Sequence, residues 1–111
     1  AMEKLGTYDK FHADLLASLL QRFKDTPEAG GSMLDNTLVL FGCSNSKTHV
    51  NRDYPLMLAG GRNLGIRQGQ FHDLKAQNAR MSDLLLTMLQ HIDVPATSFS
   101  DSTGVIEDIL S

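Results

Sequence analysis

The sequence lacks the features that mark several common protein classes. A single cysteine, Cys43, occurs among the 111 residues, which excludes an intrachain disulfide and an all-cysteine zinc site. The net charge is −3 and Lys and Arg are not clustered, so the basic surface expected of a nucleic-acid-binding protein is missing and no nucleic-acid partner is predicted. Every apolar run falls far short of the roughly 20 residues that a membrane span requires. These absences leave an ordinary globular domain.

The composition supports that class. Hydrophobic residues make up 41% of the chain and charged residues 21%, close to average globular usage, and the length predicts one domain. Ala1-Met2 is expected to be a cloning remnant, so we interpret residues 1–7 as a lead-in and residues 8–111 as a single α/β domain. No signal peptide precedes the domain, which leaves its compartment open.

The first predicted elements are a helix and a strand. Apolar residues recur at every fourth position from Phe11 to Phe23, which predicts an amphipathic helix over 8–24, with Asp9 as a possible cap at its start. The continuous apolar run Thr37–Phe41 predicts a strand covered on both faces. We expect the helix to pack against this strand.

A second buried strand is predicted over Leu56–Ala59, with Pro55 at its first position. Its direction relative to the first strand stays open, because the intervening loop is as long as a crossover but has no helical periodicity. Residues 65–74 are expected to form a short hairpin that turns near Gly69.

The C-terminal third predicts more helix. A stripe of leucine, methionine and isoleucine residues predicts an amphipathic helix over 81–92, ended by Pro95. Asp101–Gly104 has the composition of a turn and could also line a site. A short terminal helix is expected over 105–110.

The loop between the two strands carries the residues with the most chemistry. Ligands in open α/β sheets gather beyond the carboxyl ends of strands, and this loop begins at such an end. His49 and Asp53, with Asn45 as a weak third ligand, are the candidate metal-binding set, and solvated loop polarity is the alternative. Cys43 could be a nucleophile if a base or cation lowered the pKa of its thiol, and burial as a small hydrophobe is the alternative.

A glycine-rich segment follows the second strand. Residues 60–65 contain three glycines but lack both the GKS/T ending of a P-loop and the GxGxxG spacing of a dinucleotide site. We therefore predict that these glycines adopt positive φ in a turn and that Arg62 is solvated.

Three segments in order carry a resemblance to a known family: "LDNTLVLFG", "PLMLAGG" and "FSDSTG". Together with the two helices they resemble the C-terminal portion of an uncharacterised family of exported bacterial proteins in the alkaline phosphatase and sulfatase superfamily, over Tyr8 to about Leu110. The resemblance implies a partial alkaline-phosphatase-like sheet with flanking helices, a three-layer α/β/α fragment of a larger parent. It also implies an exported, periplasmic or cell-surface location.

The resemblance also bears on the loop. Sulfatase-like members carry a strand similar to "NTLVIFTSDNG", whose Asp and following Asn or His bind metal. In this sequence Ser44 stands where the Asp would be, and Asn45 matches the Asn. His49 falls where related families place a His before the D-x-P that Asp53 begins. Replacing the carboxylate with a hydroxyl weakens a site for a divalent cation, which would be Zn²⁺, Mn²⁺ or Ca²⁺ in the parent.

Two functions follow from this resemblance. The first is a segment of a parent that ancestrally hydrolysed small anionic phosphate or sulfate esters with bound metal. Because the nucleophile and remaining ligands would lie earlier in such a parent, the segment alone is expected to be inactive. The alternative is a non-catalytic binding or assembly module that keeps the fold without metals. Its partner would be the remainder of the parent chain or a second copy.

Overall fold

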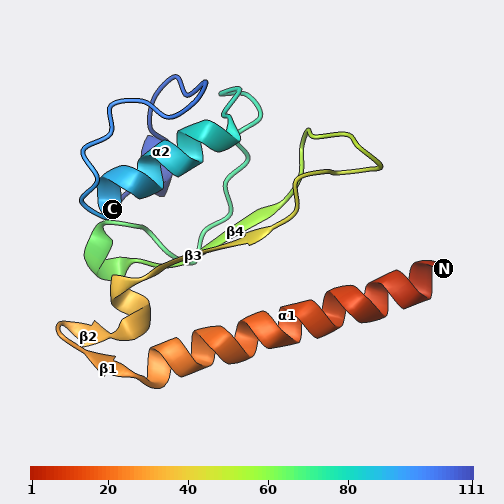
Figure 1. The fold of residues 1–111 in the computed structure, drawn as a ribbon, viewed down its shortest axis with the longest axis horizontal. Coiled ribbons are helices and arrows are strands. Elements are labelled where there is room, and N and C mark those ends of the chain that lie inside the picture. Colours follow the sequence, from red (N-terminus) through yellow and green to blue (C-terminus); the bar gives the residue numbers. More distant parts are fainter.

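The computed structural model describes residues 1–111 and contains helices and two small antiparallel sheets, a broadly α/β arrangement (Figure 1). The elements in chain order are α1 (Met2–Asp25), β1 (Pro27–Glu28), β2 (Gly31–Ser32), the 3₁₀ turn η1 (Met33–Asn36), β3 (Leu38–Gly42), β4 (Leu56–Gly60), the 3₁₀ turn η2 (Arg62–Leu64), α2 (Met81–His91) and the 3₁₀ turn η3 (Glu107–Ile109). The helices predicted over 8–24 and 81–92 and both predicted strands are confirmed. The expectation that the strands are buried is wrong, because Phe41 and Met57 are 38% and 51% exposed.

The strands β3 and β4 pair antiparallel, which settles their direction. The register places Phe41 opposite Met57 and Leu40 opposite Leu58. An antiparallel pair needs no crossover helix, so the non-helical loop between the strands is sufficient to connect them. The pair lies between α2 on one side and α1 on the other (Figure 1).

Helix α1 differs from its predicted form at its start and in its packing. It begins at Met2, so the lead-in residues are helical and Asp9 lies inside the helix instead of capping it. The reason is that Met2 and Leu5 continue the apolar pattern, and the single Gly6 does not interrupt the helix. Packing against β3 was also expected, but α1 has no buried residue and contacts mainly η1 and β2.

A capping box fixes the segment to which α1 is attached. The Ser32 backbone N–H donates to the Asp35 carboxylate at 3.0 Å, and the Asp35 N–H donates back to the Ser32 hydroxyl at 3.3 Å. These bonds satisfy the first free N–H groups of the η1 turn. The spacing S-x-x-D is visible in the sequence as a turn-start signal.

The core lies around α2, on the side of the β3–β4 sheet opposite to α1 (Figure 1). Its buried apolar side chains are Ile66, Leu86, Ile106 and Ile109. The short helix predicted over 105–110 is confirmed only in part, as the 3₁₀ turn η3. The predicted hairpin over 65–74 is wrong, because Ile66 pairs with Leu110 in an isolated antiparallel bridge. That pairing leaves only the short turn η3 near the C-terminus.

The glycine turn after β4 is confirmed and is sterically demanding. Gly60 and Gly61 have φ values of 83° and 75°, a region that side chains other than glycine rarely adopt. A Cβ at Gly60 would collide with the Thr37 carbonyl oxygen and lie 2.6 Å from that of Leu34. Arg62 is solvated as predicted and lies 3.7 Å from the Asp35 carboxylate.

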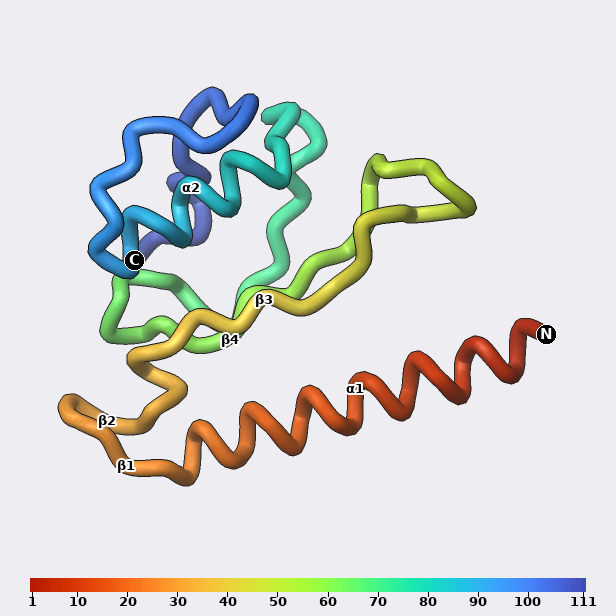
Figure 2. Tube along the Cα trace, viewed as in Figure 1, coloured from red at the N-terminus to blue at the C-terminus, as the bar shows by residue number.

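The molecule is open in shape. Its radius of gyration is 15.4 Å, against about 13 Å for a compact domain of this length. Only nine residues are buried. The chain trace shows the cause, because α1 and the loop after β3 both extend away from the α2 region (Figure 2).

Candidate functional site

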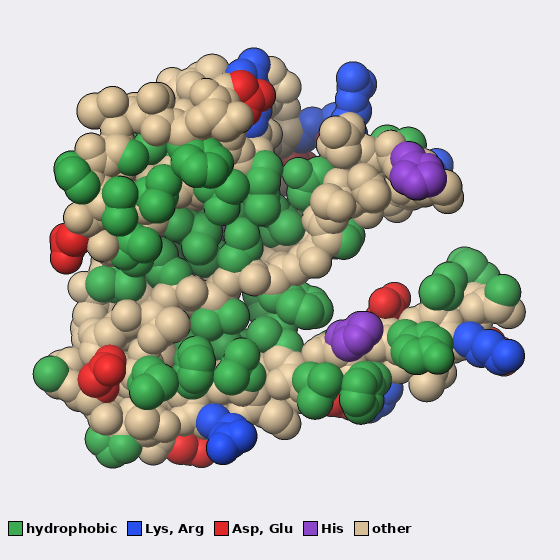
Figure 3. Space-filling view, in the orientation of Figure 1, with side chains coloured by type: hydrophobic (Ala, Val, Ile, Leu, Met, Phe, Trp, Pro, Cys, Tyr) green, Lys and Arg blue, Asp and Glu red, His purple; other side chains and the backbone are tan.

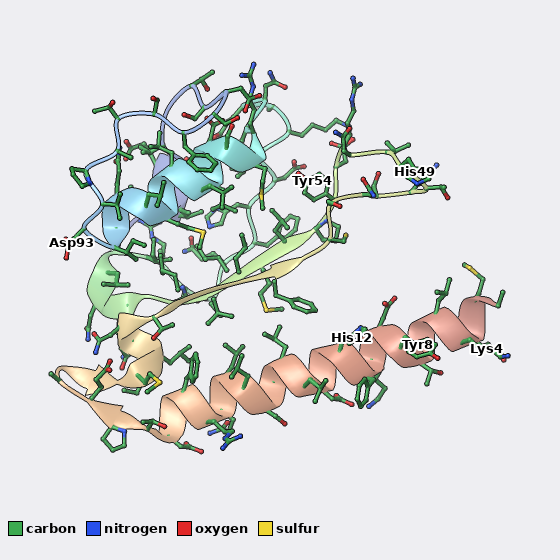
Figure 4. The ribbon with its side chains drawn as sticks, viewed as in Figure 1. Lys4, Tyr8, His12, His49, Tyr54 and Asp93 are labelled. Atoms are coloured by element: carbon green, nitrogen blue, oxygen red, sulfur yellow. The ribbon has the colours of Figure 1, made fainter.

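The loop from Cys43 to Pro55 connects β3 to β4 and protrudes from the molecule. Figure 4 places His49 at its tip and Tyr54 near its base. Residues 43–53 are all exposed. His49 and Asp53 have φ values of 60° and 50°, a left-handed conformation that is uncommon outside glycine.

Hydrogen bonds within the loop define a small turn. The Ser46 N–H donates to the Val50 carbonyl at 2.8 Å, and the Val50 N–H donates to the Lys47 carbonyl at 3.2 Å. This turn places His49 between Lys47 and Val50, pointing away from both strands (Figure 4). The loop has its own local order but is not packed against the domain.

Cys43 does not behave as a buried hydrophobe. The expectation of burial is wrong, because its side chain is exposed and its thiol donates to the Asn45 carbonyl at 3.2 Å. The strand ends at Gly42, so Cys43 already belongs to the protruding loop. No hydrogen bond joins it to a basic side chain, so the structure provides no activating base for a nucleophile.

The proposed metal ligands do not form a preorganised site. No three His, Cys, Asp or Glu side chains in the chain are grouped closely enough to hold a metal ion. The Asp53 carboxylate lies 3.6 Å from the Lys75 ammonium group, a cation that competes with a metal for it. His49 stands at the loop tip and Asn45 adds only a weak neutral donor. As placed, Asn45, His49 and Asp53 do not fit a divalent cation.

Hydrogen bonds join the segment Asp101–Gly104 to helix α2. The Thr103 N–H donates to the Asp83 carboxylate at 2.7 Å, and the Gly104 N–H does so at 3.4 Å. The Ser82 hydroxyl donates to the Asp101 carboxylate at 2.7 Å. These bonds attach the C-terminal segment to the first turn of α2.

Asp83 is a buried titratable group whose carboxylate accepts several backbone hydrogen bonds. Its side chain is only 4% exposed. Burial alone would raise the pKa of its carboxyl, but the N–H groups of Arg80, Thr103 and Gly104 outweigh burial, so the pKa lies below its ordinary value. Sequence reasoning missed this residue. The one available signal was an acidic side chain in the first turn of a predicted helix.

Thr87 continues the same attachment one turn further along α2. It is fully buried, its hydroxyl donates to the Asp83 carbonyl at 2.7 Å, and it accepts from the Ile106 N–H at 2.9 Å. A buried N–H group without a hydrogen-bond partner costs stability. Thr87 supplies the acceptor for the Ile106 N–H, in the extended segment that leads to η3.

Two surface depressions of the molecule lie away from the loop between β3 and β4. One is lined by residues just after α2, including Asp93, on the side of the molecule opposite the loop (Figure 4). A second lies beside Asp83 and Gly104. Neither includes a residue of the loop. The candidate ligands therefore line neither of these two depressions.

Comparisons with known proteins add no relative. No protein family, no curated protein and no solved structure matches this chain. No helix of the structure has both the length and the apolar character needed to cross a lipid bilayer.

Proposed function

We propose that this chain is the C-terminal α/β segment of an exported protein of the alkaline phosphatase and sulfatase superfamily, and that the segment serves assembly of the fold instead of catalysis. The superfamily assignment rests on the sequence resemblance of its motifs. The observation that carries the assembly role is the uncovered apolar surface, since side chains such as Phe11, Leu15 and Met57 are at least half exposed. Phe11 and Leu15 lie one turn apart on α1, and contiguous exposed apolar surface of this kind marks interaction sites.

The ancestral reaction of such a parent is hydrolysis of a phosphate or sulfate ester. The part that this segment could add is one wall of the site, with His49 as its best donor. Because Asp53 is paired with Lys75 and Ser44 replaces the expected carboxylate, the loop alone does not provide a divalent-cation site. The segment is accordingly inactive on its own.

Thermal unfolding with added metal tests this division of roles. We expect excess Zn²⁺ or Mn²⁺ to leave the Tm unchanged, and His49→Ala to behave like the unaltered chain. A site half-saturated at one hundredth of the metal concentration would stabilise the fold by about 2.7 kcal/mol, which in a domain of this size raises Tm by on the order of 10 °C. A rise of that size that disappears in His49→Ala would reject the non-catalytic role.

His72→Ala provides a matched control for that experiment. His72 is a second histidine outside the loop, so it reports on non-specific binding of metal to imidazole. A metal effect that persists in both variants would indicate adventitious binding, and only a loss confined to His49→Ala would assign the effect to the loop.

A further inference from the structure

Helix α1 carries an apolar face wider than the surface it contacts. Leu16, Leu20 and Phe23, near the C-terminal end of the helix, are half-buried. The neighbouring row of Phe11, Leu15 and Leu19 lies on the adjoining part of the same face and remains 57%, 53% and 42% exposed. Since residues four apart stack along one side of a helix, this uncovered row is a continuous apolar ridge, which we call the α1 ridge.

A second uncovered apolar surface lies on the sheet. Phe41 and Met57 are cross-strand partners, so their side chains project from the same face. They are 38% and 51% exposed. We call this pair the sheet patch. Figure 3 shows hydrophobic side chains both on α1 and on the strands, on either side of an open notch.

The exposed area is large enough for a stable dimer. The accessible surface of the chain is 8167 Å², whereas a compact monomer of 12.2 kDa exposes only about 6,000 Å². Helix α1, which buries no residue, and the exposed loop after β3 both contribute to the excess. Stable interfaces bury about 800 Å² on each partner, so a dimer of ordinary size would cover only part of this excess of roughly 2,000 Å².

We propose that a second copy of this chain covers these surfaces in a two-fold symmetric dimer, with the α1 ridge of each protomer packed on the sheet patch of the other. The inference rests on the assembly role proposed above and names its partner. A two-fold axis requires a surface that is complementary to itself. The chain offers both halves of such a contact, because it exposes a helix ridge and a sheet patch at once.

The charges on α1 permit this arrangement. The helix carries four acidic residues and four basic residues: Glu3, Asp9, Asp14, Asp25, Lys4, Lys10, Arg22 and Lys24. Acidic and basic residues are equally frequent in each half of the helix, so bringing two copies together creates no block of like charge. A small-molecule occupant is disfavoured, because neither surface depression described above includes a residue of α1, β3 or β4.

Sedimentation equilibrium over a wide concentration range tests the dimer. We expect the chain to sediment at twice its monomer mass, and Leu15→Asp and Met57→Asp each to weaken dimerisation by roughly 100-fold or more, since each change enters a symmetric interface twice. Ala17→Asp is the matched control, because it adds the same charge to the opposite face of α1 and should leave the dimer intact. Far-ultraviolet circular dichroism confirms that each variant is folded.

A mixture of the two interface variants tests the reciprocal contact itself. When Leu15→Asp pairs with Met57→Asp, both changes fall in one half of the interface and the other half is unaltered. The mixture should therefore associate more tightly than either variant alone. If the mixture gains nothing, the helix and the sheet do not contact each other across the dimer and the proposed geometry is rejected.

A chain that remains a monomer at every concentration would overturn the dimer. That result would leave the metal experiment unaffected, because a lack of metal response and a lack of self-association are measured separately. The apolar surface would then belong to a different protein segment, such as an earlier part of a parent chain.

Discussion

Helices α1 and α2 are both amphipathic, but they are held in opposite ways. The longer helix, α1 (Met2–Asp25), buries no residue, whereas the shorter, α2 (Met81–His91), buries four. Three of those four are polar: Ser82, Asp83 and Thr87. The polar groups of α2 bind a chain segment that is distant in sequence, and this contact holds α2 in place. The apolar stripe of α1 has no such partner and stays partly exposed.

The largest loss of stability should come from a change at Gly60, in the turn between the region of α1 and the region of α2. Gly60→Ala is expected to destabilise the fold by more than about 3 kcal/mol, because the strained backbone alone costs roughly 1–3 kcal/mol and the Cβ also collides with the Thr37 carbonyl. Chemical denaturation measures the loss. Gly69→Ala is the control, since Gly69 has a similar φ of 76° and open space around its Cβ position.

The difference between these two variants isolates the collision from the backbone strain. Equal losses of stability would mean that the backbone around Gly60 shifts to accommodate the Cβ at no cost in free energy. The close approach of η1 to this turn would then contribute nothing to stability.

A smaller loss is expected when the attachment of α2 is broken. Asp83→Asn replaces one carboxylate oxygen with an amide that cannot accept hydrogen bonds, so a buried backbone N–H loses its partner. The expected cost is about 2 kcal/mol. Asp101→Asn is the control, because the Asp101 side chain is 69% exposed and its change should cost less than about 1 kcal/mol. Similar losses of stability in the two variants would show that the hydrogen bonds accepted by Asp83 contribute no more than an exposed carboxylate does.

The smallest expected effect is a change in the acid limb of the stability curve. The pKa of Asp83 is lower in the folded chain than its ordinary value of 3.8, so its stabilising contribution is present above that pH and is lost as the pH falls through the folded value. Stability of Asp83→Asn should therefore depend less on pH below about 4. Urea midpoints measured from pH 5 downward give the comparison.

A residual slope should remain in that variant. Asp35 also has a lowered pKa, because the Ser32 N–H and hydroxyl donate to its carboxylate. If Asp83→Asn and the unaltered chain lose stability in parallel as the pH falls, the low pKa of Asp83 makes no contribution to the fold.

Local patterns in the sequence predicted the elements that depend on near neighbours. Periodicity placed α2 to within a residue and located β3 and β4. The predicted helix over 105–110 is shortened to the turn η3, because the Ile106 N–H is bound by Thr87, far away along the chain. The hairpin over 65–74 failed for a similar reason, since the partner of Ile66 is Leu110. Periodicity carries no information about such long-range pairs.

The candidate site shows the same limit more sharply. Sequence spacing grouped Asn45, His49 and Asp53 because they are close along the chain. The turn that places His49 at the loop tip and the Lys75 side chain that engages Asp53 were not visible from that spacing. Asp83 was overlooked because the N–H groups that surround it come largely from Thr103 and Gly104. Proximity in sequence was therefore a poor guide to chemical grouping in this chain.

The exposed loop between β3 and β4 also divides the chain into two halves. It is the covalent link between strands that are already held together by five cross-strand residue pairs. A backbone cut near His49 would break none of the strand pairing, so residues 1–42 and 56–111 could recognise each other as separate polypeptides. The loop thus marks the place where the chain could be split, or its ends exchanged, while the fold that surrounds it is retained.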